Sequence, residues 1–159
     1  MGRKKTVIEL GKFKTRINNT LLKDENIQEI LTGTTGQTRE QFEKTKKFIH
    51  SHLFIDDTIK DTDTHIFYDV TMPDLRSQIK DIKVYMYAIC HRSILENYSK
   101  ENYWGNRTDI LAEMIEDAIL NPTVLREFGI GELVLDNIDI YNSTEFYGRI
   151  LVFTVPNFR

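Results

Sequence analysis

The stretch "IKDIKVYMYAIC", residues 79–90, decides the fold of this chain. Apolar side chains recur at every second position on one face, which carries Ile82, Val84, Met86, Ala88 and Cys90. A period of two is typical of a β-strand, because successive side chains of a strand point to opposite faces. The other face is apolar as well, with Tyr85, Tyr87 and Ile89. A strand that is apolar on both faces is central in its sheet or lies at an interface.

Three other segments predict the rest of the sheet. Residues 65–72, "HIFYDVTM", place Ile66, Tyr68 and Val70 on one face, which predicts a half-buried strand. Residues 131–142 and 147–155 predict two more strands, joined around "STEF". Pro156 is expected to end the last of them.

The clearest helix is predicted between these strands, at residues 107–120. Its apolar stripe has the spacing of one helical face and consists of Ile110, Leu111, Met114, Ile115, Ala118 and Ile119. Asn121-Pro122 is expected to end the helix, because the residue before a proline is disfavoured in helical conformation.

Helical periodicity also fills the N-terminal part of the chain. Apolar positions from 7 to 22 and from 27 to 31 predict two helices, and "TGTTGQT" at 32–38 predicts a loop. Thr38 and Gln41 resemble a capping box, and a third helix is expected to follow and to end near His52. The polar stretch 56–64 is interpreted as a linker.

The order of these elements indicates an α+β domain with a small, mostly antiparallel sheet (β-β-α-β-β) packed on a helix. We expect one domain overall, with an N-terminal helical segment at 1–64 and an α+β core at 65–159. The N-terminal segment either packs on the sheet or reaches a neighbouring molecule.

Charge is unevenly distributed, although the net charge of −3 over 159 residues is too small to indicate nucleic acid or membrane. Residues 1–16 hold six basic residues and one acidic residue, a net charge of +5. Residues 107–148 hold nine acidic residues and two arginines, a net charge of −7. One interpretation is a basic tail and a solvated acidic face. The other is that opposite ends of neighbouring copies attract each other.

Cellular location is only weakly constrained. Cys90 is the single cysteine, so no disulfide can form within the chain, which fits a reducing compartment. We expect no secretory signal and no membrane span, because no apolar run follows the basic start and none approaches about 20 residues.

Two histidines in "KFIHSHLFIDD", residues 47–57, raise the question of a metal site. On a helix His50 and His52 point about 200° apart and cannot share an ion. On an extended chain they face the same way, and a third ligand would come from Asp56, Asp57, His65 or His91. No zinc signature is present. We therefore predict solvated or capping histidines at a helix end, and no metal; a metal-dependent hydrolase is a remote third possibility.

Other candidate chemistry has a structural interpretation. Cys90 and His91 are adjacent on a strand and point to opposite faces, so we expect a buried, inert thiol. "GIGE" at 129–132 and "TGTTG" at 32–36 match no phosphate loop, and the first is expected to form a turn. Trp104 lies in an aromatic stretch that is either an exposed binding loop or a lid over the core.

The succession "HIFYDVTMP", "IKDIKVYMYAICHR", "NRTDILAEMIEDAIL", "FGIGELVLDN" and "FYGRILVFTVPNF" resembles the neck and tail-completion proteins of tailed bacteriophages, especially the tail-terminator type. The resemblance covers about residues 65–158. In such proteins a small antiparallel sheet carries a helix, and a late strand follows a "YYGR"-like turn. The longer N-terminal part leaves open a stopper or an adaptor of the neck.

This resemblance implies a structural virion protein that forms a ring, commonly of six copies, at the head–tail neck or the head-proximal end of the tail. It implies contacts with itself, with head-side connector proteins and with the tail tube, while DNA only passes through the lumen. It implies no catalysis, no cofactor and no membrane, and assembly in the host cytoplasm. The alternative is a non-enzymatic regulatory or adaptor module.

A ring needs two different complementary patches on each subunit. The basic start and the acidic segment 107–148 are one candidate pair, and sheet pairing across subunits through strand 82–90 is another. The residues that we expect at interfaces are Lys4, Lys5, Lys12, Tyr85, Tyr87, Trp104, Glu113, Glu116 and Arg149.

Overall fold

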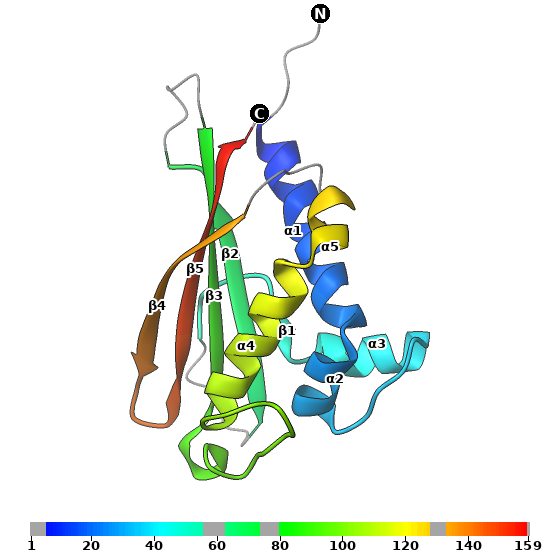
Figure 1. The fold of residues 1–159 in the computed structure, drawn as a ribbon, viewed down its shortest axis with the longest axis vertical. Helices are drawn as coiled ribbons and strands as arrows, with labels where there is room; N and C mark the ends of the chain where they lie inside the picture. The colour runs from blue at the N-terminus through cyan, green and yellow to red at the C-terminus, as the bar shows by residue number, and fades with distance from the viewer. Residues whose placement is uncertain (1–5, 56–62, 74–79, 128–132, 159) are drawn as a thin grey trace, which may run out of the picture.

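A five-stranded sheet with helices on one face forms the molecule (Figure 1). The computed structural model describes residues 6–55, 63–73, 80–127 and 133–158. The strands are β1 (Ile49–His50), β2 (Thr64–Thr71), β3 (Lys80–His91), β4 (Val134–Asn142) and β5 (Phe146–Phe158). The helices are α1 (Thr6–Lys23), α2 (Glu25–Thr32), α3 (Arg39–Lys46), α4 (Arg107–Ile119) and α5 (Pro122–Glu127), with a 3-10 turn η1 (Arg92–Ile94).

The sheet has the order β1-β2-β3-β5-β4. Only the short β1 runs parallel to its neighbour, and all other pairs are antiparallel. The predicted α+β class is therefore confirmed.

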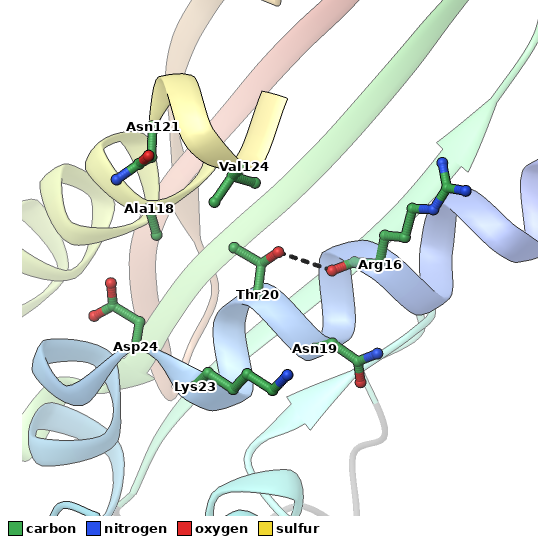
Figure 2. Close-up of a pocket in the computed structure, with 8 residues that line it drawn as sticks. All are labelled: Arg16, Asn19, Thr20, Lys23, Asp24, Ala118, Asn121 and Val124. Carbon is green, nitrogen blue, oxygen red and sulfur yellow. Dashed lines mark hydrogen bonds between the residues drawn. The ribbon is translucent and has the colours of Figure 1, made fainter. Parts of the chain in front are cut away.

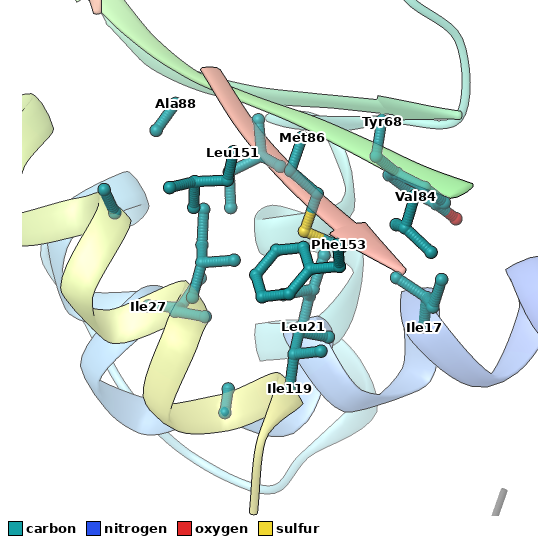
Figure 3. Close-up of a cluster of buried hydrophobic side chains, with 14 of the residues drawn as sticks. Ile17, Leu21, Ile27, Tyr68, Val84, Met86, Ala88, Ile119, Leu151 and Phe153 are labelled. Atoms are coloured by element: carbon teal, nitrogen blue, oxygen red, sulfur yellow. The ribbon is translucent and has the colours of Figure 1, made fainter. Parts of the chain in front are cut away.

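β3 is central, as its two apolar faces predict. It pairs with β2 on one side and with β5 on the other, so that Met86 lies between Tyr68 and Leu151. These three side chains are buried, and they belong to the single large cluster between sheet and helices (Figure 3). Because the core side of β3 has no contact with water, its apolar residues supply much of the hydrophobic driving force for folding.

The N-terminal helices pack on the sheet, which is one of the two arrangements that the sequence left open. Phe13, Ile17 and Leu21 of α1 are buried in the same cluster as the sheet residues. Caps define both ends of α2. Asp24 accepts the N–H of Ile27 at its start, and Gly33 ends it with φ of 78°. A left-handed residue of this kind is the usual C-terminal stop of a helix.

The third predicted helix is too long. α3 ends at Lys46, and Ile49–His50 forms β1 instead. The Ile66 N–H donates to the Phe48 carbonyl at 2.8 Å and starts the parallel pairing. The cap is also only half of a capping box, since Thr38 accepts the N–H of Gln41 but the Gln41 amide binds Thr32, Thr34 and Thr45.

Two C-terminal predictions need correction as well. Asn121-Pro122 ends α4 but also starts α5, where Asn121 accepts the N–H of Thr123 and proline suits the first helical position. β5 continues through Pro156, because β4 begins at Val134, opposite Thr154, so that no described residue of β4 pairs with Pro156. The "YGR" residues lie inside β5, as the predicted strand 147–155 has them, whereas the resemblance implies a turn there. The turn expected at Gly129 and Gly131 lies outside the described residues.

Gly148 is required by the close approach of β3 and β5. A Cβ at this position would lie 2.8 Å from the Ile89 Cα and closer still to the Ala88 carbonyl oxygen. We expect Gly148→Ala to lower the free energy of unfolding by at least about 2 kcal/mol, because the strands must separate. Urea denaturation measures this change.

Gly11→Ala is the matched control, since Gly11 lies within α1 and nothing is within 4 Å of the added Cβ. Here we expect stabilisation of about 0.5–1 kcal/mol. Equal stability of the two variants would contradict the packing of β3 against β5.

Candidate interaction surfaces

The sheet has one face that none of the described helices covers. Tyr85 and Tyr87 of β3, which the sequence places at an interface, are half-buried on this open face. Tyr141 of β4 lies beside Tyr87, with ring centroids 5.7 Å apart. Phe67, Ile89 and Phe146 form a small buried cluster on this face, and Leu53, Ile55, Tyr87 and Tyr141 all pack against it. The segment after β1 therefore covers one part of the open face, and the tyrosines border that part.

A histidine cluster lies at the covered part of the open face. His50 Nε2 is 3.1 Å from His65 Nδ1, and the His50 ring stacks on Phe67 at 4.4 Å. The prediction of a capping group at a helix end is wrong for His50, because the chain is already a strand there and its ring is partly buried. His52 is exposed, and its ring centroid is 5.8 Å from that of His50.

This cluster is an aromatic and hydrogen-bonded contact between β1 and β2. In an N–H···N bond one nitrogen must accept, so the pair holds one proton between the two facing atoms. Within the described ranges no group of three metal-ligating side chains comes together. Asp56 and Asp57, the other candidate ligands, lie outside those ranges. His91 is separate and caps η1 by accepting the Ser93 N–H.

Cys90 has the buried environment that the sequence predicts. It lies in the middle of the sheet, and burial raises the pKa of its thiol to about 11. The thiolate, which is the reactive form, is therefore rare at neutral pH.

We expect Cys90 to resist alkylation in the folded protein, both because the thiol is protonated and because reagents cannot reach it. Mass spectrometry after iodoacetamide treatment at pH 8 measures the modified fraction. The same protein in urea serves as the control and is expected to react completely. Stoichiometric labelling of the folded chain within minutes would contradict the buried position.

An apolar pair stands out on the last strand. Ile138 and Ile140, which we call the β4 strip, point to the helix side of the sheet but lie beyond the helices. Leu151, directly across from Ile138, is 1% exposed, whereas Ile138 is 54% exposed. The helical layer therefore ends between β5 and β4. Large apolar side chains exposed in this way are candidate contact sites.

Charged residues of α4 and β5 border the β4 strip. Arg149, across from Ile140, bonds Asp109 of α4 with 2.7 Å between Nε and Oδ1. This ion pair raises the pKa of Arg149, with the hydrogen bond as the main cause. Arg149 is thus engaged within its own chain. Glu113 is exposed and Glu116 half-buried on the outer surface of α4.

A second exposed apolar pair lies at the start of α1. Val7 is 81% exposed and Ile8 is 48% exposed, and the Lys12 side chain nearby is 61% exposed. We call Val7, Ile8 and Lys12 the α1 tip. Lys4 and Lys5 lie outside the described residues. Basic and apolar groups therefore occur together at this end of the helix.

Trp104 is 76% exposed in the loop that precedes α4. Its neighbours Tyr98 and Tyr103 are partly buried and pack against the core. The aromatic stretch therefore covers the core with its tyrosines, as the lid interpretation has it, and presents its tryptophan to solvent.

Both edges of the sheet carry an aspartate that binds the next backbone N–H. On β4 the Asp139 carboxylate accepts the Ile140 N–H at 2.7 Å. On β2, beyond the short β1, the Asp69 carboxylate accepts the Val70 N–H at 2.8 Å and also binds Lys14. A charged side chain that occupies an edge donor discourages pairing with another strand. No signal in the sequence separates these two aspartates from ordinary surface residues.

Removing the acceptor at Asp139 should expose the edge. We expect Asp139→Ala to increase concentration-dependent association, because a free donor can join a foreign strand. Asp139→Asn is the matched control, since it loses the charge but keeps the acceptor oxygen, and it should behave as the wild type. Static light scattering measures both. If the alanine and asparagine variants associate equally, charge rather than the acceptor protects the edge.

A polar groove of about 460 Å³ lies between α1 and the α4–α5 junction (Figure 2). Arg16, Lys23 and Asp24 contribute its charged groups. Burial raises the pKa of Asp24, but its carboxylate caps α2. The groove therefore holds helix-capping and surface groups rather than a recognisable catalytic set.

The comparisons agree with a phage-related protein. A family model, YomW, matches residues 15–155, and the chain therefore belongs to the YomW family. This family is prophage-associated, so the protein is phage-related. No curated protein and no solved structure gives a significant match. Among the described helices, none is long and apolar enough to cross a membrane.

Proposed function

We propose that the protein is a structural component of a phage particle that forms a ring at the head–tail neck or at the head-proximal end of the tail. It would act there as a tail-terminator or tail-completion protein, joining the tail tube to the head-side connector. Its work is mechanical, without catalysis, cofactor or metal. Assembly takes place in the host cytoplasm.

The observation that carries this proposal is the presence of two unlike exposed patches on one phage-related chain. The α1 tip is apolar and basic, whereas the β4 strip is apolar and lies beside the acidic helix α4. A protein that exists as a closed ring needs two unlike, complementary surfaces per subunit. The acidic residues of α4 also suit a wall past which DNA moves, because like charges do not adhere.

A second candidate function is a regulatory or adaptor module that binds a protein partner as a monomer or dimer. The open face with Tyr85, Tyr87 and Tyr141 favours it, since tyrosine is enriched in binding sites on protein surfaces. Such a module needs no contact between copies. The two functions therefore differ in solution mass and in location.

Location in the particle is the decisive test. We expect quantitative mass spectrometry of purified phage particles to find the protein at a few copies per particle, near six. Deletion of its gene should leave heads and tails that do not join, as seen by electron microscopy. Absence from particles, with normal particles after deletion, would reject the neck function and favour the adaptor.

Light scattering across protein concentration and salt supplies the second readout. A closed assembly near six times the 18.7 kDa chain mass supports a ring. A dimer at all concentrations, combined with absence from particles, supports the adaptor.

A further inference from the structure

We infer that copies of this chain associate head to tail, with the α1 tip of one copy docked on the β4 strip of the next. The inference rests on the self-assembly contained in the proposed function and names the two surfaces that make the contact. Three properties of the described residues lead to it: matching apolar groups, opposite charge, and position on opposite sides of the molecule.

Each patch is exposed because no helix or strand of the described residues covers it. In α1 the residues that follow the tip, such as Phe13 and Ile17, are buried in the core, whereas Val7 and Ile8 extend beyond it. On the sheet, α4 contacts β3 and β5. It leaves Ile138 and Ile140 outside its cover. Two pairs of β-branched side chains are thus available to bury each other.

The charges around the patches are opposite. Lys12 of the tip makes a long contact with Glu9, 3.9 Å between Nζ and Oε1. The sequence adds further basic residues ahead of α1. Beside the β4 strip, the one arginine of β5 is neutralised by Asp109. Glu113 and Glu116, four and seven residues after Asp109, share its face of α4 and therefore keep this side acidic. Complementary charge of this kind sets orientation and speeds encounter.

Position requires the contact to be between copies. α1 packs against β2, near one edge of the sheet, and β4 is the strand at the other edge. Figure 1 shows the start of α1 at one end of the molecule and the β4–β5 turn at the other. One chain cannot bring the two patches together. A contact between unlike surfaces repeats from copy to copy and closes into a ring when the rotation allows it.

Backbone chemistry favours a helix end over a strand as the occupant. The Ile140 N–H is already bound by Asp139, so strand addition at this point would displace an ion–dipole bond. A helix tip that contacts only side chains has no such cost. The β4 strip is therefore suited to the α1 tip rather than to the edge strand of another copy.

Thiol capture tests the contact directly. We would mix a chain carrying Ile8→Cys with a chain carrying Ile140→Cys and add a short bis-maleimide. The expected result is a product of twice the 18.7 kDa chain mass, at several-fold higher yield than from either variant alone. Wild type controls for Cys90, which is buried. Capture records a weak contact too, so the test does not depend on a stable ring in solution.

A matched pair controls for random collision. Glu43→Cys places a thiol on the exposed surface of α3, away from both patches. If Ile8→Cys links to Glu43→Cys as well as to Ile140→Cys, the inference is wrong. Efficient linking of Ile140→Cys to itself would overturn it as well, because that result indicates a symmetric contact between two β4 strands.

A further variant tests the contribution of charge to the contact. Lys12→Glu in the Ile8→Cys chain should lower the yield several-fold at low salt and have little effect at high salt. Lys47→Glu, an exposed change of the same charge at the C-terminal end of α3, should leave the yield unchanged. Equal effects of both changes would show that net charge alone matters, and would remove the role of Lys12.

The cross-linking result and the presence of the protein in particles test two different claims, so either can be wrong without the other. A protein that is present in particles but shows no specific Ile8–Ile140 link would retain its neck function and assemble through other surfaces. A specific link in a protein that is absent from particles would keep the head-to-tail contact and reject the neck.

Discussion

The rest of the structure depends on the burial of β3 from both sides. Its core face fits between the helices and its flanking strands, and its other face is apolar for much of its length. Such a strand is stable only with a neighbour on each edge, and β2 and β5 supply them. The close approach at Gly148 shows how tightly this pairing is made. All other elements are arranged around that strand.

A mismatch between the two layers follows from this arrangement. The sheet is wider than the helical layer, because α4 and α1 cover β2, β3 and β5 but not β4. In turn α1 is longer than the core that it covers, so its first turn is exposed. Both apolar patches are therefore products of the same packing geometry. This origin explains why they lie at opposite sides, as assembly through unlike surfaces requires.

Periodicity in the sequence predicts the elements whose stripes face the large core: α1, α4, β2, β3 and the β4–β5 hairpin. It fails where a contact over distance overrides the local pattern. β1 is only two residues long and exists because β2 pairs with it, so the helical pattern before His50 was misleading. For the same reason the His50–His65 contact could not be foreseen from spacing. The edge aspartates were missed because only strand order shows which strands are edges.

A count of charges along the sequence overstates the number of charged side chains that can contact another copy. Asp109 is engaged by Arg149, Asp136 by Lys83 and Lys14 by Asp69, all within one copy. Because exposed ion pairs contribute little and are screened by salt, the long-range asymmetry between the two ends of the chain cannot by itself hold copies together. In the head-to-tail contact that we infer, burial of Val7, Ile8, Ile138 and Ile140 would supply most of the free energy of association. In that inferred contact, charge would decide which of the possible apolar contacts forms, and Lys12 is the described residue on which that choice would depend most.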